Sequence, residues 1–261
     1  MDVKVLVVGF GSVGRAFARL VALKGSLVER RFGVRVRIVG VVDSGGAAFK
    51  PEGFGGADLL KLSEMPRSGV CVFEPYGVCG LGLESLYDSV GFDVHVEATP
   101  SNYVSGEPGL GNVMLALRRG VNVVLANKAP LALKFDDVVG AARARGLKVR
   151  FRATVMGGSP LIDTILSLRS HEVRMVYGIL NATTNYILTL MHENLVGLDE
   201  AIKMAQAIGV AEADPSLDVD GWDAAAKLAI LARLSGVKLS INDIARESLS
   251  KVAFRDVVEA L

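Results

Sequence analysis

Acidic side chains and a lysine are concentrated in residues 209–227 of the chain. Asp223 and Lys227 are four positions apart, so on a helix they share a face. A lysine held beside a carboxylate can deliver a proton to a developing alkoxide. Glu212 and Asp218 are carboxylates with which the ammonium group of a substrate could pair. The stretch is therefore a candidate for acid–base chemistry.

The same residues also have a purely structural interpretation. Asp223 and Lys227 could form an ordinary ion pair, which stabilises a helix by about 0.2–0.5 kcal/mol. Asp220 with Asp223 resembles an N-terminal capping arrangement. Gly209 is what a helix needs just after its C-terminus. Composition and spacing alone favour this structural interpretation.

A glycine-rich motif follows the first apolar run of the chain. Because it directly follows a strand-like run and opens a helical pattern, it indicates a dinucleotide-binding turn, with a plain strand-to-helix turn as the alternative. The first glycine permits the tight turn, the second lets backbone approach the pyrophosphate, and the third allows close packing of helix on strand. The motif G-x-G-x-x-G consists of Gly9, Phe10, Gly11, Ser12, Val13 and Gly14.

Asp43 ends the second predicted strand, where an acid accepts hydrogen bonds from the hydroxyls of the adenosine ribose. It lies further from Gly14 than the usual distance of about 20 residues, because the first helix is long. A competing interpretation is a turn residue before Ser44. An acid at this place favours NAD and repels a 2′-phosphate, although Lys50 is close enough in sequence to weaken that preference.

Two further polar segments follow apolar runs of the kind expected for buried strands. Thr99 and Pro100 follow one such run, and Asn127 and Lys128 follow another. Open parallel sheets bind ligands beyond the carboxyl ends of their strands. These four residues are therefore expected to contribute to the same cofactor site as the glycine motif.

The elements that must position these residues alternate between strand-like apolar runs and amphipathic helical stretches in the first half. That alternation is typical of a parallel sheet with crossover helices. From about residue 154 helices dominate. The predicted strands are 3–8, 34–42, 93–98, 121–125, 148–152 and 173–179, and the predicted helices are 14–27, one ending near 119, 136–145, 161–169, 184–193, 198–208, 221–234 and 252–261.

The pattern predicts an α/β protein with a Rossmann-type, doubly wound parallel sheet. Residues 1–130 are expected to form the dinucleotide-binding domain, and residues 131–261 a smaller substrate-binding domain. With 51% hydrophobic residues and a formal net charge of +1, nothing favours binding to nucleic acid or to an anionic membrane. The N-terminus lacks the features of a signal peptide, and no apolar run reaches the roughly 18 residues of a membrane span. A cytoplasmic location is expected.

The two cysteines, Cys71 and Cys79, are eight positions apart with no histidine nearby, which is not a zinc spacing. Two cysteines are too few for a disulfide framework, so two free thiols are expected. Gln206 is the only glutamine of the chain, a weak indication of a thermophilic source, in which an internal disulfide would be less surprising.

Motifs in six places combine into a resemblance to one family. Between about residues 7 and 235 the chain is similar to homoserine dehydrogenases, which interconvert L-aspartate 4-semialdehyde and L-homoserine with NAD(P) in threonine and methionine biosynthesis. The resemblance implies a Rossmann domain, an α+β catalytic domain and a homodimer. The motifs, in order, are GFGSVG, VEATPSN, LANKAPLAL, ATVMGGSPLI, GILNATTNYIL and GVAEADPSLDVDGWDAAAKLAIL.

The resemblance also assigns roles to individual residues. Lys227 matches the family's proton donor, and Asp223 and Glu212 match its substrate-binding acids. Lys128 matches a lysine that lies beside both cofactor and substrate. Two further matches are Thr183 in the substrate loop and Gly209 near the cofactor.

Other functions remain open beside this one. The chain could be a different dehydrogenase of an amino acid or semialdehyde, or a catalytically silent sensor of dinucleotides. Arg152 stands where the family often has a glutamate that helps hold a monovalent cation, so no metal is expected. Ala182 stands where the family usually has glycine, and alanine would be strained if that backbone needs positive φ. The chain also ends before the usual C-terminal segment, as in a short form.

Overall fold

The computed structural model describes residues 1–168 and 170–260, and these divide into two compact units, Met1–Gly158 and Ser159–Leu261. The division falls later than the predicted boundary at 130, because the last strand of the first unit's sheet, Val149–Arg150, comes after that boundary. Residues 169 and 261 lie outside the described residues, so the predicted ends of the helices at 161–169 and 252–261 are not compared there.

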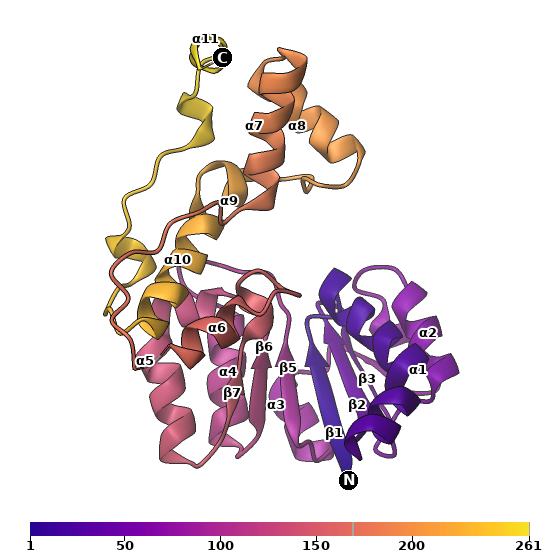
Figure 1. Ribbon diagram of the computed structural model, residues 1–261. Helices are drawn as coiled ribbons and strands as arrows, with labels where there is room; N and C mark the ends of the chain where they lie inside the picture. The colour runs from indigo at the N-terminus through magenta and orange to yellow at the C-terminus, as the bar shows by residue number, and fades with distance from the viewer. Residues whose placement is uncertain (169, 261) are drawn as a thin grey trace. The chain divides into compact units, whose positions relative to one another are not determined.

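The first unit contains a seven-stranded sheet with the order β4-β3-β2-β1-β5-β6-β7 (Figure 1). The strands paired around β1 are parallel, as predicted, whereas β3 and β4 add an antiparallel edge that the sequence analysis did not anticipate. The α/β fold is confirmed. The strands are β1 (Asp2–Val8), β2 (Arg35–Asp43), β3 (Gly46–Phe49), β4 (Gly77–Cys79), β5 (Val94–Glu97), β6 (Asn122–Leu125) and β7 (Val149–Arg150).

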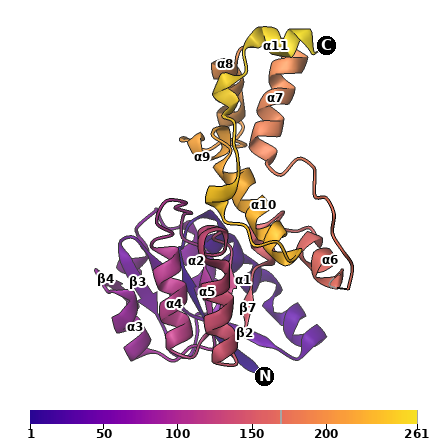
Figure 2. The same cartoon turned by 90° about the vertical axis from the view of Figure 1, so that its left-hand side faces the viewer.

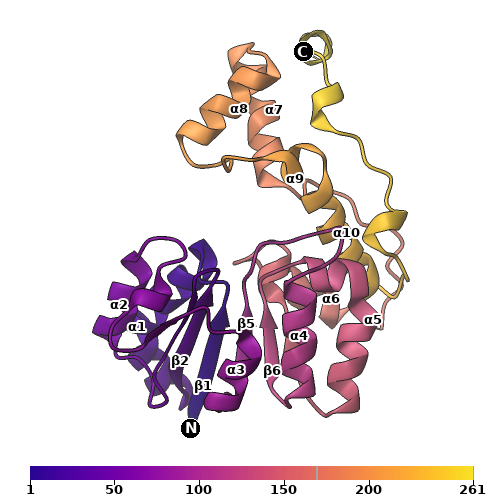
Figure 3. The same cartoon turned by 180° about the vertical axis from the view of Figure 1, so that it is seen from behind.

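Strand β1 shows why both faces of the sheet need a cover. Successive side chains of a strand point to opposite faces. Val5 and Val7 pack in a core cluster with residues of α1 (Ser12–Phe32) and α2 (Gly56–Glu64), whereas Leu6 packs in a second cluster with Leu86 of α3 (Leu83–Ser89). The continuous apolar run of β1 is thus that of a strand buried on both faces. The helices that cover these faces, α1 and α2 for one and α3 for the other, can be followed in Figure 3.

Crossover helices connect these strands. The first, α1, ends at Phe32, five residues beyond its predicted end at 27, and Gly33, with φ of 68°, follows it. The last, α5, bends at Lys134, where φ is −137°, and the predicted helix 136–145 corresponds to the part after this bend. The helices are α1 (Ser12–Phe32), α2 (Gly56–Glu64), α3 (Leu83–Ser89), α4 (Gly109–Arg118) and α5 (Ala129–Ala144), with 3-10 turns η1 (Val70–Val72) and η2 (Arg152–Thr154).

The regular elements among the described residues of the second unit are all helices, and its core lies between α7 (Ala182–Asn194), α8 (Leu198–Ala207) and α11 (Phe254–Glu259) (Figure 2). Ile187 and Met191 of α7 pack there with Ala201 and Ala205 of α8 and with Val257 of α11. The helices are α6 (Leu161–Ser167), α7 (Ala182–Asn194), α8 (Leu198–Ala207), α9 (Ser216–Val219), α10 (Trp222–Leu234) and α11 (Phe254–Glu259), with 3-10 turns η3 (Ile241–Asp243) and η4 (Leu249–Lys251).

The strand predicted at 173–179 is wrong for the chain as described. This segment is irregular, and no described residue pairs with it. A strand needs a neighbour for its backbone hydrogen bonds, and the second unit offers none among its described residues. The alternation of apolar side chains that suggested a strand is present, but Met175, Tyr177 and Ile179 are exposed.

The expectation of two free thiols is also wrong, because Cys71 and Cys79 form a disulfide. Cys71 lies in η1 and Cys79 in β4, and the pairing of β4 with β3 brings their Cα atoms to 4.6 Å, within the usual range of about 4.4–6.8 Å. Gly46, opposite Cys79, makes room for the link: a Cβ there would lie 3.0 Å from the Cβ of Cys71.

In the described part of the chain, no helix is long and apolar enough to cross a membrane.

Candidate functional site

The turn between β1 and α1 depends on close approaches that only glycine tolerates. Gly9 has φ of +92°, and a Cβ built on it would lie 2.3 Å from the carbonyl carbon of Ala98. A Cβ on Gly14 would lie 2.6 Å from the carbonyl oxygen of Gly9. A Cβ on Gly11 would meet nothing within 4 Å. The motif therefore combines a tight turn, a closely packed helix and one position where backbone borders open space.

The N-terminus of α1 has the properties of an anion site. The helix begins at Ser12 after Gly11, with no side-chain cap and no acidic residue in its first turn. The first N–H groups of a helix lack intrahelical partners, and its dipole is positive at that end. Val13 is exposed there, whereas Phe10 is buried and its N–H donates to the carbonyl of Val42. Phe10 thus shapes the turn, and the N–H groups of the first helical turn are the donors suited to a phosphate.

Asp43 lies at the carboxyl end of β2, and both of its carboxylate oxygens have backbone partners. Oδ1 accepts from the N–H of Gly45 at 2.9 Å, and Oδ2 accepts from the N–H of Val70 at 3.2 Å. The side chain therefore does order the turn, as the competing interpretation holds. A carboxylate has about four acceptor sites, so acceptor capacity for ribose hydroxyls is left.

Lys50, which could have reversed the preference for NAD, has partners of its own. Its Nζ lies 3.3 Å from Oδ2 of Asp58 and 4.8 Å from the centre of the Tyr76 ring. The phenol of Tyr76 and the carboxylate of Asp58 raise the pKa of Lys50, against the effect of desolvation. The charge that could have offset Asp43 is therefore compensated by Asp58.

A buried polar network lies under the end of β5. The Glu97 carboxylate is fully buried and accepts from the N–H of Thr99 at 2.9 Å, from the Thr99 hydroxyl, and from Nδ2 of Asn112 at 3.0 Å. Nε2 of His95, also fully buried, lies 3.2 Å from Glu97, and Nδ1 of His95 lies 2.8 Å from the Tyr87 hydroxyl. Burial, and then the nearby Glu97 charge, raise the pKa of Tyr87 above its usual range.

Asn127 continues this network to the next strand end. Its Nδ2 donates to the Thr99 hydroxyl at 3.1 Å and to the carbonyl of Pro100 at 3.3 Å. Its Oδ1 accepts from the Ser101 hydroxyl at 2.9 Å and from the first N–H of α5 at 3.0 Å. The structure therefore brings Thr99, Pro100, Asn127 and Lys128 together at neighbouring strand ends, as predicted from the sequence. Sequence analysis did not identify the role of Glu97, because its partners are set by the fold.

Lys227 and Asp223 form a close ion pair on α10 in the second unit. Lys227 Nζ lies 2.6 Å from Asp223 Oδ2, and both side chains are about 14% and 13% exposed, respectively. The same Nζ donates to the carbonyl of Leu180 at 2.7 Å. An ammonium group has three donors, so these two partners leave one N–H for a substrate oxygen. A general acid must lie within hydrogen-bond reach of the oxygen that it protonates, and an oriented N–H suits that role.

Asn181 is a member of this cluster that the sequence analysis missed. Its Nδ2 donates to Asp218 Oδ1 at 2.6 Å and to Asp223 Oδ2 at 2.8 Å. Its Oδ1 accepts from the N–H of Thr184 at 2.7 Å, so the residue also caps α7. From the sequence, an asparagine before a helix indicates only such a cap.

The remaining predicted substrate and cofactor residues of this unit are less tightly held. Glu212 is exposed, and Thr183 is half-buried in the first turn of α7. Gly209 has φ of +76° just beyond α8, and its N–H donates to the carbonyl of Gln206 at 3.0 Å. This is the helix-terminating role of the structural interpretation. Gly209 and Glu212 remain predictions as ligand contacts.

Two departures from the family pattern can be placed. Ala182 is the first residue of α7 and does not have positive φ, so alanine is not strained there. Arg152 lies in η2. Across residues 1–168 and 170–260, no group of three or more histidine, cysteine or acidic side chains is arranged to hold a metal ion.

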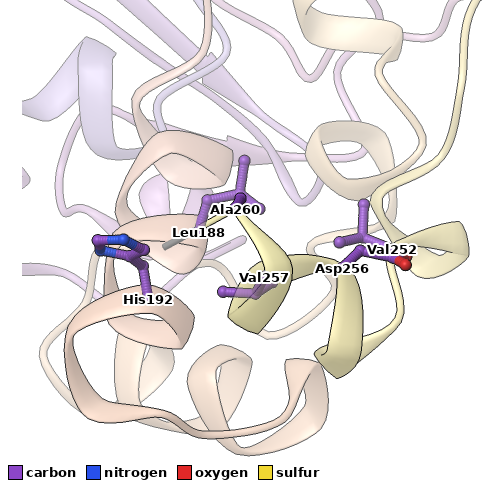
Figure 4. A pocket seen from close by; sticks show the side chains of 6 residues that line it. All are labelled: Leu188, His192, Val252, Asp256, Val257 and Ala260. Carbon is purple, nitrogen blue, oxygen red and sulfur yellow. The ribbon is translucent and has the colours of Figure 1, made fainter.

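A cavity of about 280 Å³ lies between α7 and the C-terminal segment of the second unit (Figure 4). Its walls are mainly apolar, and they include no residue predicted to bind cofactor or substrate. The lining residues are Leu188, His192, Val252, Asp256, Val257 and Ala260.

The sheet with its glycine turn, the uncapped helix N-terminus and an acid at the end of β2 define a dinucleotide-binding α/β protein. The comparisons with known proteins then give the family. The family model for homoserine dehydrogenase matches residues 160–261. Because relatives in that family also match over most of both chains, the chain belongs to the homoserine dehydrogenase family.

Three relatives illustrate the match. A homoserine dehydrogenase of Methanocaldococcus jannaschii is 34% identical over 95% of this chain and 74% of its own length. An NAD(+)-dependent homoserine dehydrogenase of Pseudomonas canavaninivorans is 36% identical over 99% of this chain and 74% of its own. A solved structure of a hyperthermophilic archaeal homoserine dehydrogenase mutant in complex with NADPH has a TM-score of 0.82 and 29% identity, and covers 99% of this chain and 76% of that chain.

Proposed function

We propose that the protein is an NAD(P)-dependent oxidoreductase that interconverts L-aspartate 4-semialdehyde and L-homoserine. Family membership supports this reaction, and the observation that carries it in this chain is the oriented ion pair of Lys227 and Asp223. A helix ion pair alone would need neither burial nor the second contact of Lys227 with the carbonyl of Leu180. A silent sensor of dinucleotides would have no use for such a group.

The first unit is suited to hold NAD or NADP. The uncapped N-terminus of α1 and the open backbone at Gly11 fit a pyrophosphate, and the carboxylate of Asp43 fits a ribose diol. When bound, the dinucleotide supplies or accepts the hydride. Because Lys50 is paired with Asp58, we propose that Asp43 decides the preference and that NAD(H) binds at least as well as NADP(H).

The second unit supplies the proton and recognises the amino acid. In the reductive direction, Lys227 gives its third proton to the alkoxide oxygen, and Asp223 keeps the ammonium oriented. Glu212, Asp218 and Asp223 are the acids proposed to pair with the substrate ammonium. Thr183 and Lys128 are proposed as further substrate contacts on the basis of the resemblance.

We further propose that the protein is a homodimer formed through residues 172–179. Met175, Tyr177 and Ile179 are 75%, 89% and 71% exposed and alternate along the chain, so in an extended conformation they share a face. A second copy of the segment would satisfy its backbone by strand pairing in a two-fold interface. Light scattering should give twice the chain mass, and Tyr177→Asp should reduce it to one. A wild-type monomer would contradict the proposal.

We propose a cytoplasmic location. The disulfide of Cys71 and Cys79 is rare in that compartment in mesophiles, but intracellular proteins of hyperthermophiles are rich in disulfides. Cell fractionation of the native source with an antibody against the chain tests this, and recovery in a secreted fraction would contradict it.

The experiment that tests the reaction follows the absorbance of NAD(P)H with purified protein. L-homoserine, and then a panel of other amino acids and amino alcohols, are supplied with NAD or NADP. Turnover that prefers L-homoserine is the expected result. Preference for another substrate would instead identify a different amino-acid dehydrogenase. Cofactor binding without turnover of any substrate would identify a sensor.

A further inference from the structure

Two carboxylates of the second unit lie close together around one amide group. Asp218 in α9 and Asp223 in α10 both accept hydrogen bonds from Nδ2 of Asn181, at 2.6 and 2.8 Å. Two like charges repel each other, and more strongly where solvent is partly excluded. An amide NH₂ has two donors, and here each donor serves one carboxylate. The amide therefore holds together two acids that would otherwise separate.

The orientation of that amide is set by the helix that it caps. Asn181 Oδ1 accepts from the N–H of Thr184 at 2.7 Å and from the hydroxyl of the same residue at 3.0 Å. Because the oxygen is committed to the N-terminus of α7, the nitrogen must face the acids. A flipped amide would place its NH₂ against the N–H of Thr184 and its oxygen against two carboxylates. Asn181 is 6% exposed, so water has little access to replace these contacts.

The two hydrogen bonds from Asn181 Nδ2 to Asp218 and Asp223, here called the bridge, include the carboxylate oxygen that orients Lys227. Asp223 Oδ2 receives both the N–H of Asn181 and, at 2.6 Å, the ammonium of Lys227. The carbonyl of Leu180, the residue just before Asn181, accepts a second N–H of Lys227 at 2.7 Å. The segment 180–181 therefore fixes the ammonium twice, directly through its backbone and indirectly through Asp223.

We infer that Asn181 is a positioning residue that aims the Lys227 proton at the substrate by holding Asp223. The inference rests on the proposed function for its catalytic consequence, but not for its geometry. Asn181 itself does not touch the reacting atoms in this assignment. Its side chain joins the cap of α7 to the acids of α9 and α10, and the loss of the bridge should be separable from the loss of the cap.

Two variants separate the bridge from the cap. Serine and aspartate are both good helix N-caps, so Asn181→Ser and Asn181→Asp should keep α7 folded. Neither places an amide NH₂ between the acids. For both we expect kcat to fall about 10–100-fold, the effect of a small misplacement of a reacting group, while the Kd for NAD(H) stays unchanged. Asn194→Asp, the same change at the exposed far end of α7, is the control and should leave kcat unchanged.

The pH dependence of Asn181→Asp distinguishes positioning from packing. The groups that face position 181 are Asp218 from α9 and Asp223 with Lys227 from α10. A carboxyl added beside two carboxylates has a raised pKa, and its protonated form again has one O–H to donate. The ratio of kcat for this variant to kcat for wild type should therefore rise as pH falls. The ratio for Asn181→Ser, which cannot change protonation, should stay flat.

A crystal structure of Asn181→Ser completes the test without any assay of activity. We expect the carboxylate of Asp223 to turn away from Asp218 and the pair with Lys227 to lengthen beyond hydrogen-bond distance. An unchanged position of Asp223 and Lys227, or wild-type kcat in an active protein, would overturn the inference. Failure of wild type to turn over any substrate would instead overturn the proposed function, and the position of Asp223 would still decide the inference.

Discussion

The polar network at the strand ends and the cluster around Lys227 each contain an acid that holds other groups in place. The two regions differ in which groups the acid holds. In the first unit the acid, Glu97, is fully buried and fixes backbone, because its contacts order the chain around Thr99. In the second unit the acid, Asp223, is 13% exposed and fixes the ammonium of another side chain, Lys227. The difference fits a rigid support in the first region and, in the second, the proton transfer proposed for Lys227.

Removal of the Lys227 ammonium should give the largest effect on activity. We expect Lys227→Ala to lower kcat by about 10²–10⁴-fold, the typical contribution of a positioned general acid, with little change in cofactor binding. Lys203→Ala, which removes an exposed lysine of α8, is the matched control. Steady-state kinetics and a fluorescence titration with NADH measure the two quantities, and near-normal turnover of Lys227→Ala would refute its assignment.

The next effect in size is expected on stability, when the buried network around Glu97 is disturbed. In Glu97→Gln one oxygen becomes an NH₂ that faces donors from Thr99, Asn112 or His95, so we expect a loss of about 1–3 kcal/mol in the free energy of unfolding. Glu52→Gln, at an exposed turn position outside this network, should cost nothing measurable. Urea denaturation compares the two variants. Equal stabilities would mean that the network around Glu97 does not hold the strand ends.

A smaller effect is expected on the choice of cofactor. Asp43→Ser removes the charge that repels a 2′-phosphate, so the ratio of the Kd for NADP to the Kd for NAD should fall about tenfold, equivalent to about 1.4 kcal/mol. Asp58→Ala, which frees the ammonium of Lys50, should shift the ratio in the same direction by less. Titration of both cofactors decides this. A wild-type protein that binds NADP far more tightly than NAD would contradict the role of Asp43.

The smallest effect concerns Tyr87, whose raised pKa makes it a reporter of the buried network. Its phenol ionises near pH 10 in the unfolded chain and only at higher pH in the folded chain, so its contribution to stability is complete below about pH 10 and lost as pH rises further. The free energy of unfolding should therefore fall less steeply above pH 10 in Tyr87→Phe than in wild type. Identical slopes would show that the phenol is not shielded.

The parts of the fold that a local sequence pattern determines could be predicted from the sequence. The turn after β1 follows from three glycines at fixed spacing after an apolar strand, and Gly9 has the positive φ that a tight turn needs. The placement of α7, α8 and α10 follows from helical periodicity. The strand ends around Thr99 and Asn127 could be grouped because carboxyl ends of parallel strands share one edge.

Features whose partners are distant in sequence or absent from the described residues could not be predicted. Asn181 meets Asp218 and Asp223 across 37 and 42 positions, a relation that no local pattern encodes. Cys71 and Cys79 are joined because β4 pairs with β3, and these short strands gave no signal of their own. The strand predicted at 173–179 has the right alternation, but no described residue pairs with it.

The most direct test of the account compares the oxidation of L-homoserine with that of 4-hydroxybutanoate, which has the same alcohol and carboxylate but no ammonium. Glu212, Asp218 and Asp223 are the acids proposed to pair with the substrate ammonium, so a substrate without that group loses a charge-assisted contact. We predict that kcat/KM with NAD falls by about 10²-fold or more for 4-hydroxybutanoate. Comparable kcat/KM for the two alcohols, or no oxidation of L-homoserine at all, would contradict the account.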